Sequence, residues 1–335
     1  MQRLHGHQSF GTHPLRALEK NNMQSTNYLV AKQQIEDYMS IDDFIITVFC
    51  LVDDLSNGLL KGRKLRQRGF RPILTDSEVI TMEIVGEFLG YDQDKKIWEY
   101  FRNYWRHFFP KIPDRPNFVR QAANLHVVKR LLQGRLAENL GACSDRLHII
   151  DGLPMPTCKF ARAHFSRTFK GTAAYGYCAT KQERYFGFRG HVVISSCGMI
   201  TAATFTAANV DERDVCPELT AKIRGLLLGD KGFIRPSLTE ELDAKGLHLQ
   251  TPVRENMKES RPESFLRWMM SKRRLVETVI GQLSERFHIE KIRARDLWHQ
   301  VSRFWRKLLA HTVCVKIGLD LGHEPLQFER LIRPH

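Results

Sequence analysis

The sequence predicts an α/β fold, in which a mixed β-sheet is covered by helices and preceded by a helical region. Up to about residue 145, apolar residues recur at helical spacing, whereas beyond it short aliphatic and β-branched runs alternate with helical segments. Two of those runs, 147–151 and 226–230, lack polar alternation, which is typical of strands buried on both faces of a sheet. We therefore expect a helical N-terminal region at 1–140, an α/β domain at 145–290 and a basic helical C-terminal extension at 291–335.

The composition indicates a globular protein with an anionic partner. The chain has 335 residues, 42% of them hydrophobic, and a formal charge of +14. A positive excess of this size favours a polyanion, and no apolar run approaches the roughly 20 residues of a membrane-spanning helix, so we expect DNA and no membrane. The chain start lacks the apolar core of a signal peptide. Seven scattered cysteines without a C-x-x-C pair predict neither disulfides nor a zinc site and fit a reducing cytoplasm.

Three segments of the first region predict helices. The first begins at Thr75 or Asp76, which are good N-cap residues, and ends at Gly90. The second and third segments, 95–109 and 117–136, carry apolar residues at helical spacing, which we interpret as core rather than as a surface for base stacking. The stripes are Ile97, Phe101, Tyr104 and Phe108 in the second segment, and Phe118, Ala122, Leu125 and Leu132 in the third. Three short amphipathic helices predict a small bundle, of which a helix-turn-helix variant is one form.

A basic stretch at 61–72 precedes these helices. In a chain this basic, we expect its side chains to contact DNA phosphates, with a solvated loop as the alternative. The residues concerned are Lys61, Arg63, Lys64, Arg66 and Arg68.

The elements of the α/β domain are predicted in a fixed order. They are a short strand that closes on Asp151, a hairpin of strands 191–196 and 199–206, a helix at 211–225, a strand at 226–230, a helix at 237–246, a strand at 247–253 and a helix at 263–288.

Two of the predicted strands end in an aspartate, Asp151 and Asp230. Ligands of open α/β sheets bind beyond the carboxyl ends of the strands, so neighbouring strands would bring these two carboxylates together. Carboxylates held a few ångströms apart stay ionised only with a cation between them, and Mg²⁺ prefers such oxygen ligands. The alternative for Asp230 is a turn residue, because Asp-Lys-Gly is a good exit from a strand.

Glu277 is a candidate third carboxylate. It borders the buried stripe of the helix at 263–288, from where it can reach the sheet. The alternative is a simple ion pair with Arg273, four residues earlier.

The order Asp, Asp, Glu on a strand, a strand and a helix resembles the RNase H-like catalytic core of DDE transposases, most closely those of the insertion-sequence 982 family. Residues 145–290 carry the resemblance strongly, in six motifs: "IIDGLPMPTCK", "YFGFRGHVVISSCGMI", "AANVDERDV", "LLGDKGF", "LQTPVRENMK" and "RRLVETVIGQL". The resemblance implies an RNase H-like sheet and a catalytic, metal-binding triad of Asp151, Asp230 and Glu277. It also implies two Mg²⁺ ions, with Mn²⁺ as a substitute, and cleavage at transposon ends followed by joining of the freed 3′-OH to target DNA. A homodimer on DNA and a nucleoid-associated protein of the bacterial cytoplasm are the further expectations.

Several basic residues near this triad are DNA-binding candidates. We expect Lys231 and Arg254 to steady the scissile phosphates, with a solvated surface role as the alternative for each. Arg273 matches a basic residue of the family four positions before the glutamate. The lysine or arginine that often follows the glutamate two turns later is Ser284 here, so that role is not carried over.

The C-terminal helix at 293–308 offers a last basic row. Arg295, Arg303 and Arg306 align beside a stripe of Leu297, Val301, Phe304 and Leu308 that we expect to be buried. We expect the arginines to face DNA, with a solvated cationic face as the alternative. Two other functions stay open: a nuclease that cuts without joining, and a DNA-binding protein without catalysis.

Overall fold

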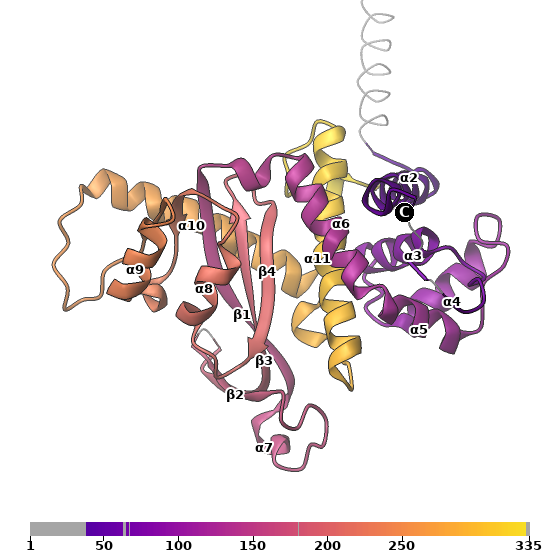
Figure 1. The fold of residues 1–335 in the computed structure, drawn as a ribbon, viewed down its shortest axis with the longest axis horizontal. Helices are drawn as coiled ribbons and strands as arrows, with labels where there is room; N and C mark the ends of the chain where they lie inside the picture. Colours follow the sequence, from indigo (N-terminus) through magenta and orange to yellow (C-terminus); the bar gives the residue numbers. More distant parts are fainter. Residues whose placement is uncertain (1–37, 63–64, 67, 180, 333–335) are drawn as a thin grey trace, which may run out of the picture.

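A computed structural model describes residues 38–62, 65–66, 68–179 and 181–332 (Figure 1). The α-helices are α2 (Ile41–Leu60), α3 (Asp76–Phe88), α4 (Asp94–Tyr104), α5 (Arg115–Asn124), α6 (His126–Asn139), α7 (Phe160–Ala163), α8 (Glu212–Leu219), α9 (Pro236–Asp243), α10 (Glu263–Glu285) and α11 (Leu297–Asp320). The strands are β1 (Leu147–Lys159), β2 (Ala174–Cys178), β3 (Glu183–Ser195), β4 (Ile200–Ala207), β5 (Gly225–Leu228) and β6 (Leu247–Gln250).

The sheet combines antiparallel and parallel strands. Along its main path the order is β4, β3, β1, β5 and β6, while β2 pairs with the first half of β3 beside β4. β1, β3 and β4 are antiparallel neighbours, and β5 and β6 run parallel to β1. Three antiparallel strands in chain order, followed by two parallel strands on the other side of the first, form the RNase H-like arrangement. The predicted fold class is therefore confirmed.

Helices cover both faces of the sheet (Figure 1). Adjacent residues of β1 point to opposite faces, so Ile149 packs in the core shared with α10, whereas Ile150 packs against α8 and α9. Gly198, with φ of 83°, forms the turn of the β3–β4 hairpin, where the sequence predicts it.

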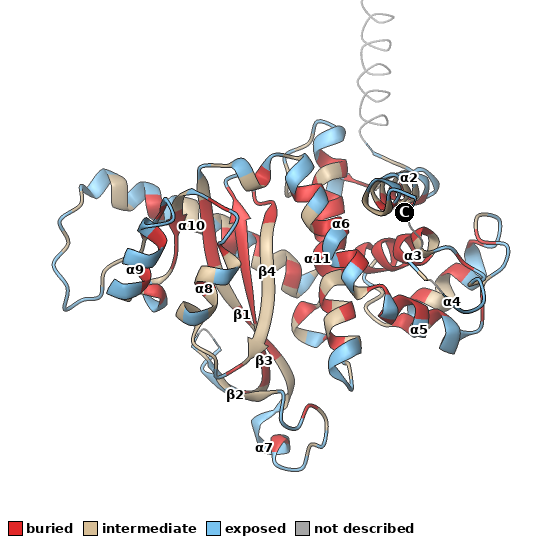
Figure 2. Cartoon of the chain, in the orientation of Figure 1, coloured by how far each residue is buried: buried red, intermediate tan, exposed pale blue. Residues whose placement is uncertain are grey.

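The helical region packs around α11. Its helix α3 begins with a capping box between Thr75 and Glu78, as the N-cap pattern predicts. α11 contacts α3, α5 and α6, and the buried residues of these helices continue into the core of the sheet (Figure 2). The C-terminal helix is therefore a central packing element, although the sequence suggests an extension.

The structure corrects several predicted elements. β1 continues for eight residues beyond Asp151, and together with β2, α7 and the first half of β3 it forms an arm, residues 154–189, that projects from the sheet (Figure 1). The segment 117–136 contains two helices, and α2 is an additional one. Tyr104 and Leu297, expected in buried stripes, are 68% and 42% exposed. Among the described residues, no helix has the length and hydropathy needed to cross a membrane.

Candidate active site

The two strand-end aspartates lie side by side in the sheet. β1 and β5 are parallel neighbours, and Ile149 is in register with Leu228. Asp151 and Asp230 each follow two residues later, so they leave the same edge of the sheet at the same height. Both line one pocket of about 1050 Å³, together with Glu212 of α8. The predicted pairing of these two strands is confirmed.

Asp151 lies in an environment that opposes its ionisation. Burial raises its pKa to about 6, and the negative charges of Asp230 and Glu212 act in the same direction. The N–H of Gly152, which donates to Oδ1 over 2.7 Å, and the positive charge of Arg273 only partly offset this effect. A carboxyl group with its pKa raised by neighbouring carboxylates is typical of a functional site.

Asp230 is also a turn residue. Its Oδ1 accepts a hydrogen bond of 2.8 Å from the N–H of Gly232, which caps the short 3₁₀ turn at 231–233. Asp230 can therefore be both a turn residue and a metal ligand, because the capping bond uses Oδ1 and leaves Oδ2 to bind a cation.

Glu212 is a site residue that the sequence prediction missed. Its Oε1 accepts from Nη1 of Arg189 at 2.7 Å, and burial raises the pKa of its carboxyl group. A Cβ atom on Gly152 would lie only 2.8 Å from this oxygen, so the glycine allows the close approach. The signal in the sequence is the run Asp211-Glu212 just after the hairpin. Asp211 caps α8, and Glu212, the next residue, turns toward the sheet.

The donor set at this edge fits a hard divalent cation. Asp151 and Asp230 offer carboxylate oxygens in one pocket, and a cation between them would relieve their repulsion. Among the described residues, however, no group of three or more His, Cys, Asp or Glu side chains is gathered closely enough to hold a metal ion.

Glu277 lies apart from the pocket. It is exposed on α10, which packs against β1, and it is not among the side chains that line the pocket. The structure therefore brings two of the three predicted carboxylates together, and the role of Glu277 stays a prediction. The alternative, an ion pair between Glu277 and Arg273, is absent from the described part of the chain. Arg273 instead acts on Asp151, while its Nε is buried without a hydrogen-bond partner among the described groups.

The other predicted DNA contacts divide into three groups. Arg63 and Lys64 lie outside the described residues. Five cations are exposed: Lys61, Arg68, Lys231, Arg254 and Arg295. Arg66 is half-buried and forms a bidentate pair with Asp76, in which Nη1 donates to Oδ2 over 2.7 Å.

Arg303 and Arg306 do not face solvent, which contradicts the prediction that they face DNA. Arg306 is 1% exposed and donates to Glu87 and to Asp94, each over 2.5 Å. Arg303 is paired with Asp94 as well. The reason is that their row on α11 faces α3 and the start of α4, where acidic side chains complement it.

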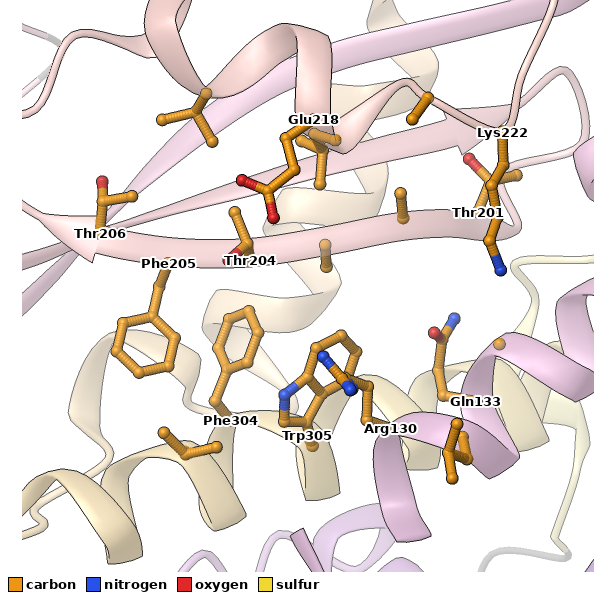
Figure 3. A pocket seen from close by; sticks show the side chains of 18 of the residues that line it. Arg130, Gln133, Thr201, Thr204, Phe205, Thr206, Glu218, Lys222, Phe304 and Trp305 are labelled. Atoms are coloured by element: carbon orange, nitrogen blue, oxygen red, sulfur yellow. The ribbon is translucent and has the colours of Figure 1, made fainter. Parts of the chain in front are cut away.

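A second large pocket runs alongside strand β4. It has a volume of about 1000 Å³ and lies between β4, α6, α8 and α11 (Figure 3). Its polar lining includes Arg130, Gln133 and Glu218, and none of the predicted site residues lines it.

Comparison with known proteins agrees with the resemblance in the sequence. Residues 141–297 match the family model of the transposase DDE domain. A cryo-EM structure of a piggyBac transposase synaptic complex with hairpin DNA is similar to this chain with a TM-score of 0.46 and 11% sequence identity, over 85% of this chain and 76% of that chain. No curated protein matches in sequence. The matched segment contains β1, β5 and α10, and with them both strand-end aspartates and Glu277. Residues 141–297 are thus similar to a transposase DDE domain.

Proposed function

We propose that this protein is a DDE transposase that cleaves and joins DNA. In this proposal Asp151, Asp230 and Glu277 are its catalytic triad and bind two Mg²⁺ ions, with Mn²⁺ as a substitute. The observation that carries the proposal is the aspartate pair beyond Ile149 and Leu228, in one pocket and with the pKa of Asp151 raised. The six motifs in order further support membership of the insertion-sequence 982 family.

The chemistry is phosphodiester cleavage at the transposon end, followed by attack of the freed 3′-OH on target DNA. Divalent cations bound by these carboxylates would activate the attacking oxygen and stabilise the leaving 3′-oxygen. Asp151 must be ionised to act as a ligand, so the site works best above pH 6. Lys231 and Arg254, both exposed, hold the phosphates that flank the scissile bond. The predicted 3′-OH nucleophile makes a covalent enzyme intermediate unnecessary.

The remaining parts of the chain serve DNA binding. The N-terminal region, 1–140, contacts the element end through the cations of the stretch 61–72, and Arg295, an exposed cation of the segment 291–335, contributes as well. Two ends must be cut and joined together, which favours a homodimer on DNA. The protein acts at the nucleoid of a bacterial cytoplasm, where its substrate lies.

The test is cleavage and strand transfer by purified full-length protein on DNA that carries the element's ends. We expect Asp151→Asn, Asp230→Asn and Glu277→Gln each to lower cleavage by roughly 10³-fold or more, as loss of a core catalytic group does in other enzymes. Asp243→Asn, an exposed aspartate at the end of α9, is the matched control and should stay active. Joining of a labelled 3′-OH end separates a transposase from a nuclease that only cuts.

Glu212 provides the sharpest comparison for the third carboxylate. If Glu277→Gln cleaves normally while Glu212→Gln is inactive, the third ligand is Glu212, the half-buried glutamate of α8. If Glu277→Gln alone abolishes cleavage, the resemblance has identified the triad correctly.

A further inference from the structure

The arm, residues 154–189, carries exposed aromatic side chains next to the catalytic pocket. Phe160, Phe165, Tyr175 and Tyr177 are 47%, 84%, 50% and 51% exposed. The same segment buries Phe169 and Tyr185, at 7% and 6% exposure, so its packing already has the aromatic side chains that it needs. Four large rings left in solvent on one short arm are therefore a feature to explain.

The exposed rings form an ordered surface. Tyr175 and Tyr177 alternate with Gly176 along β2, so both project from one side. The opposite side is closed, because a Cβ on Gly176 would lie 2.7 Å from Ala208 and 2.9 Å from the Tyr185 ring. Tyr175 is flanked by the rings of Phe160 and Phe186, each with a centroid 5.3 Å away.

The arm is also strongly basic. Residues 154–189 contain seven lysines and arginines and a single acidic residue, Glu183. Six of the cations are exposed: Lys159, Arg162, Arg167, Lys170, Lys181 and Arg184. Arg184 lies directly opposite Tyr177 in the β2–β3 ladder, which brings a guanidinium beside an exposed ring. Exposed rings interleaved with cations are the features by which proteins hold unpaired nucleotides, whose bases stack while their phosphates meet the positive charges.

The surface is continuous with the catalytic site. Phe160, Tyr175 and Tyr177 line the same pocket as Asp151 and Asp230. Along β3, Phe186, the partner of Tyr175, lies six positions before Val192, the partner of Asp151. That separation is about 20 Å at roughly 3.3 Å per residue. A strand that enters the carboxylate pocket therefore reaches the rings within a few nucleotides of the scissile phosphate.

We propose that the aromatic arm binds unpaired nucleotides beside the cleavage site by stacking their bases on Tyr175 and Tyr177. This subsite rests on the proposed function, since it serves DNA that is bound at the catalytic carboxylates. It holds the DNA end in a frayed state, with at least one base withdrawn from the duplex.

The experiment compares binding of two probes to the full-length protein without divalent cation: a blunt duplex and the same duplex with a six-nucleotide 3′ overhang containing 2-aminopurine. We expect the wild type to prefer the overhang and to quench its fluorescence. Tyr175→Ala and Tyr177→Ala should each weaken overhang binding by about 5- to 150-fold, the range for one stacked base. Both should leave blunt-duplex binding unchanged. Tyr175→Trp should restore the preference, and Tyr104→Ala, which removes an even more exposed ring on α4, should not alter it.

Two results would overturn the proposal. One is a wild type that binds both probes equally, and the other is full quenching by both alanine variants. A change of oligomeric state in those variants with unchanged overhang binding would assign the rings to contact with a second copy of the chain instead. Asp230→Asn separates this proposal from the proposed function, because it should lose cleavage while keeping the overhang preference.

Discussion

Two aspartates of this molecule, the buried Asp94 and the half-buried Asp151, differ in how their charges are matched. At the start of α4, burial opposes ionisation of Asp94, but Arg306 and Arg303 hold the pKa of that carboxyl below its usual range. At the end of the sheet, burial raises the pKa of Asp151 to about 6, and its nearest charged neighbours include two more carboxylates. The charge of Asp94 is therefore compensated by arginine side chains of the protein. The charge of Asp151 is only partly compensated, which leaves the site open to a cation from outside the protein.

The helical region extends this pattern into a network. Three acidic side chains meet three cations that are at most 1% exposed: Glu83, Glu87 and Asp94 face Lys129, Arg306 and Lys307. Burying such a network costs desolvation energy, but its specific ion pairs select which helices pack together. A carboxylate pair without cations costs energy and gives no such packing specificity. The contrast indicates structural roles for the first set and a functional role for the second.

The largest effect on stability should come from breaking the matched region. Arg306→Gln removes the cation that donates to Glu87 and Asp94 and leaves buried carboxylates uncompensated. We expect a loss of about 3–5 kcal/mol in the free energy of unfolding, measured by chemical denaturation. Arg295→Gln, an exposed arginine just before α11, is the control and should change stability little. Equal stability of the two variants would mean that the network is not essential to the fold.

Removing the unmatched charge should act in the opposite direction. The pKa of Asp151 is about 6 in the folded protein and about 3.9 in an unfolded chain, so between these values the native state binds more protons. Stability therefore falls as pH rises from 4 to 6, and the native state stays destabilised above pH 6. Asp151→Asn should be more stable than wild type at pH 7.5, by at most about 3 kcal/mol, and equal to it at pH 3.5. A variant that is less stable at pH 7.5 would show that the charge of Asp151 is compensated.

A smaller effect is expected from the exposed cations near the pocket. Each phosphate that a lysine or arginine neutralises contributes about −0.9 to the slope of log K against log salt concentration. Lys231→Gln combined with Arg254→Gln should make the slope for duplex DNA shallower by up to about two units. An unchanged slope would mean that these exposed side chains do not contact phosphates.

The sequence predicted the sheet better than the helical region. Strands β5 and β6, the β3–β4 hairpin and the pairing of β1 with β5 follow from local aliphatic runs and turn residues. The arm escaped prediction because its strands mix rings, cations and glycines without a regular alternation. The orientation of α11 escaped as well, because a row of arginines looks the same in sequence whether it faces solvent or acidic side chains of α3 and α4.

The residues of the candidate site were likewise predictable only where a local sequence pattern determines their position. Asp151 and Asp230 were found because each follows an aliphatic strand, and β-sheet register then fixes their proximity. Glu212 and Arg189 were missed, since their approach depends on how α8 folds back over Gly152. Glu277 was predicted from its place beside the buried stripe of its helix and from the resemblance in motifs, but neither determines how far it lies from the pocket.

The most direct test of the contrast is calorimetric titration of the full-length protein with Mg²⁺ and, separately, Mn²⁺ at pH 7.5. The unmatched pair should bind the cation, so the wild type should give a saturable signal that both Asp151→Asn and Asp230→Asn lose. Asp243→Asn should keep that signal. Binding that is the same in the wild type and in both site variants, or no binding by the wild type, would contradict the assignment of this pair as the metal site.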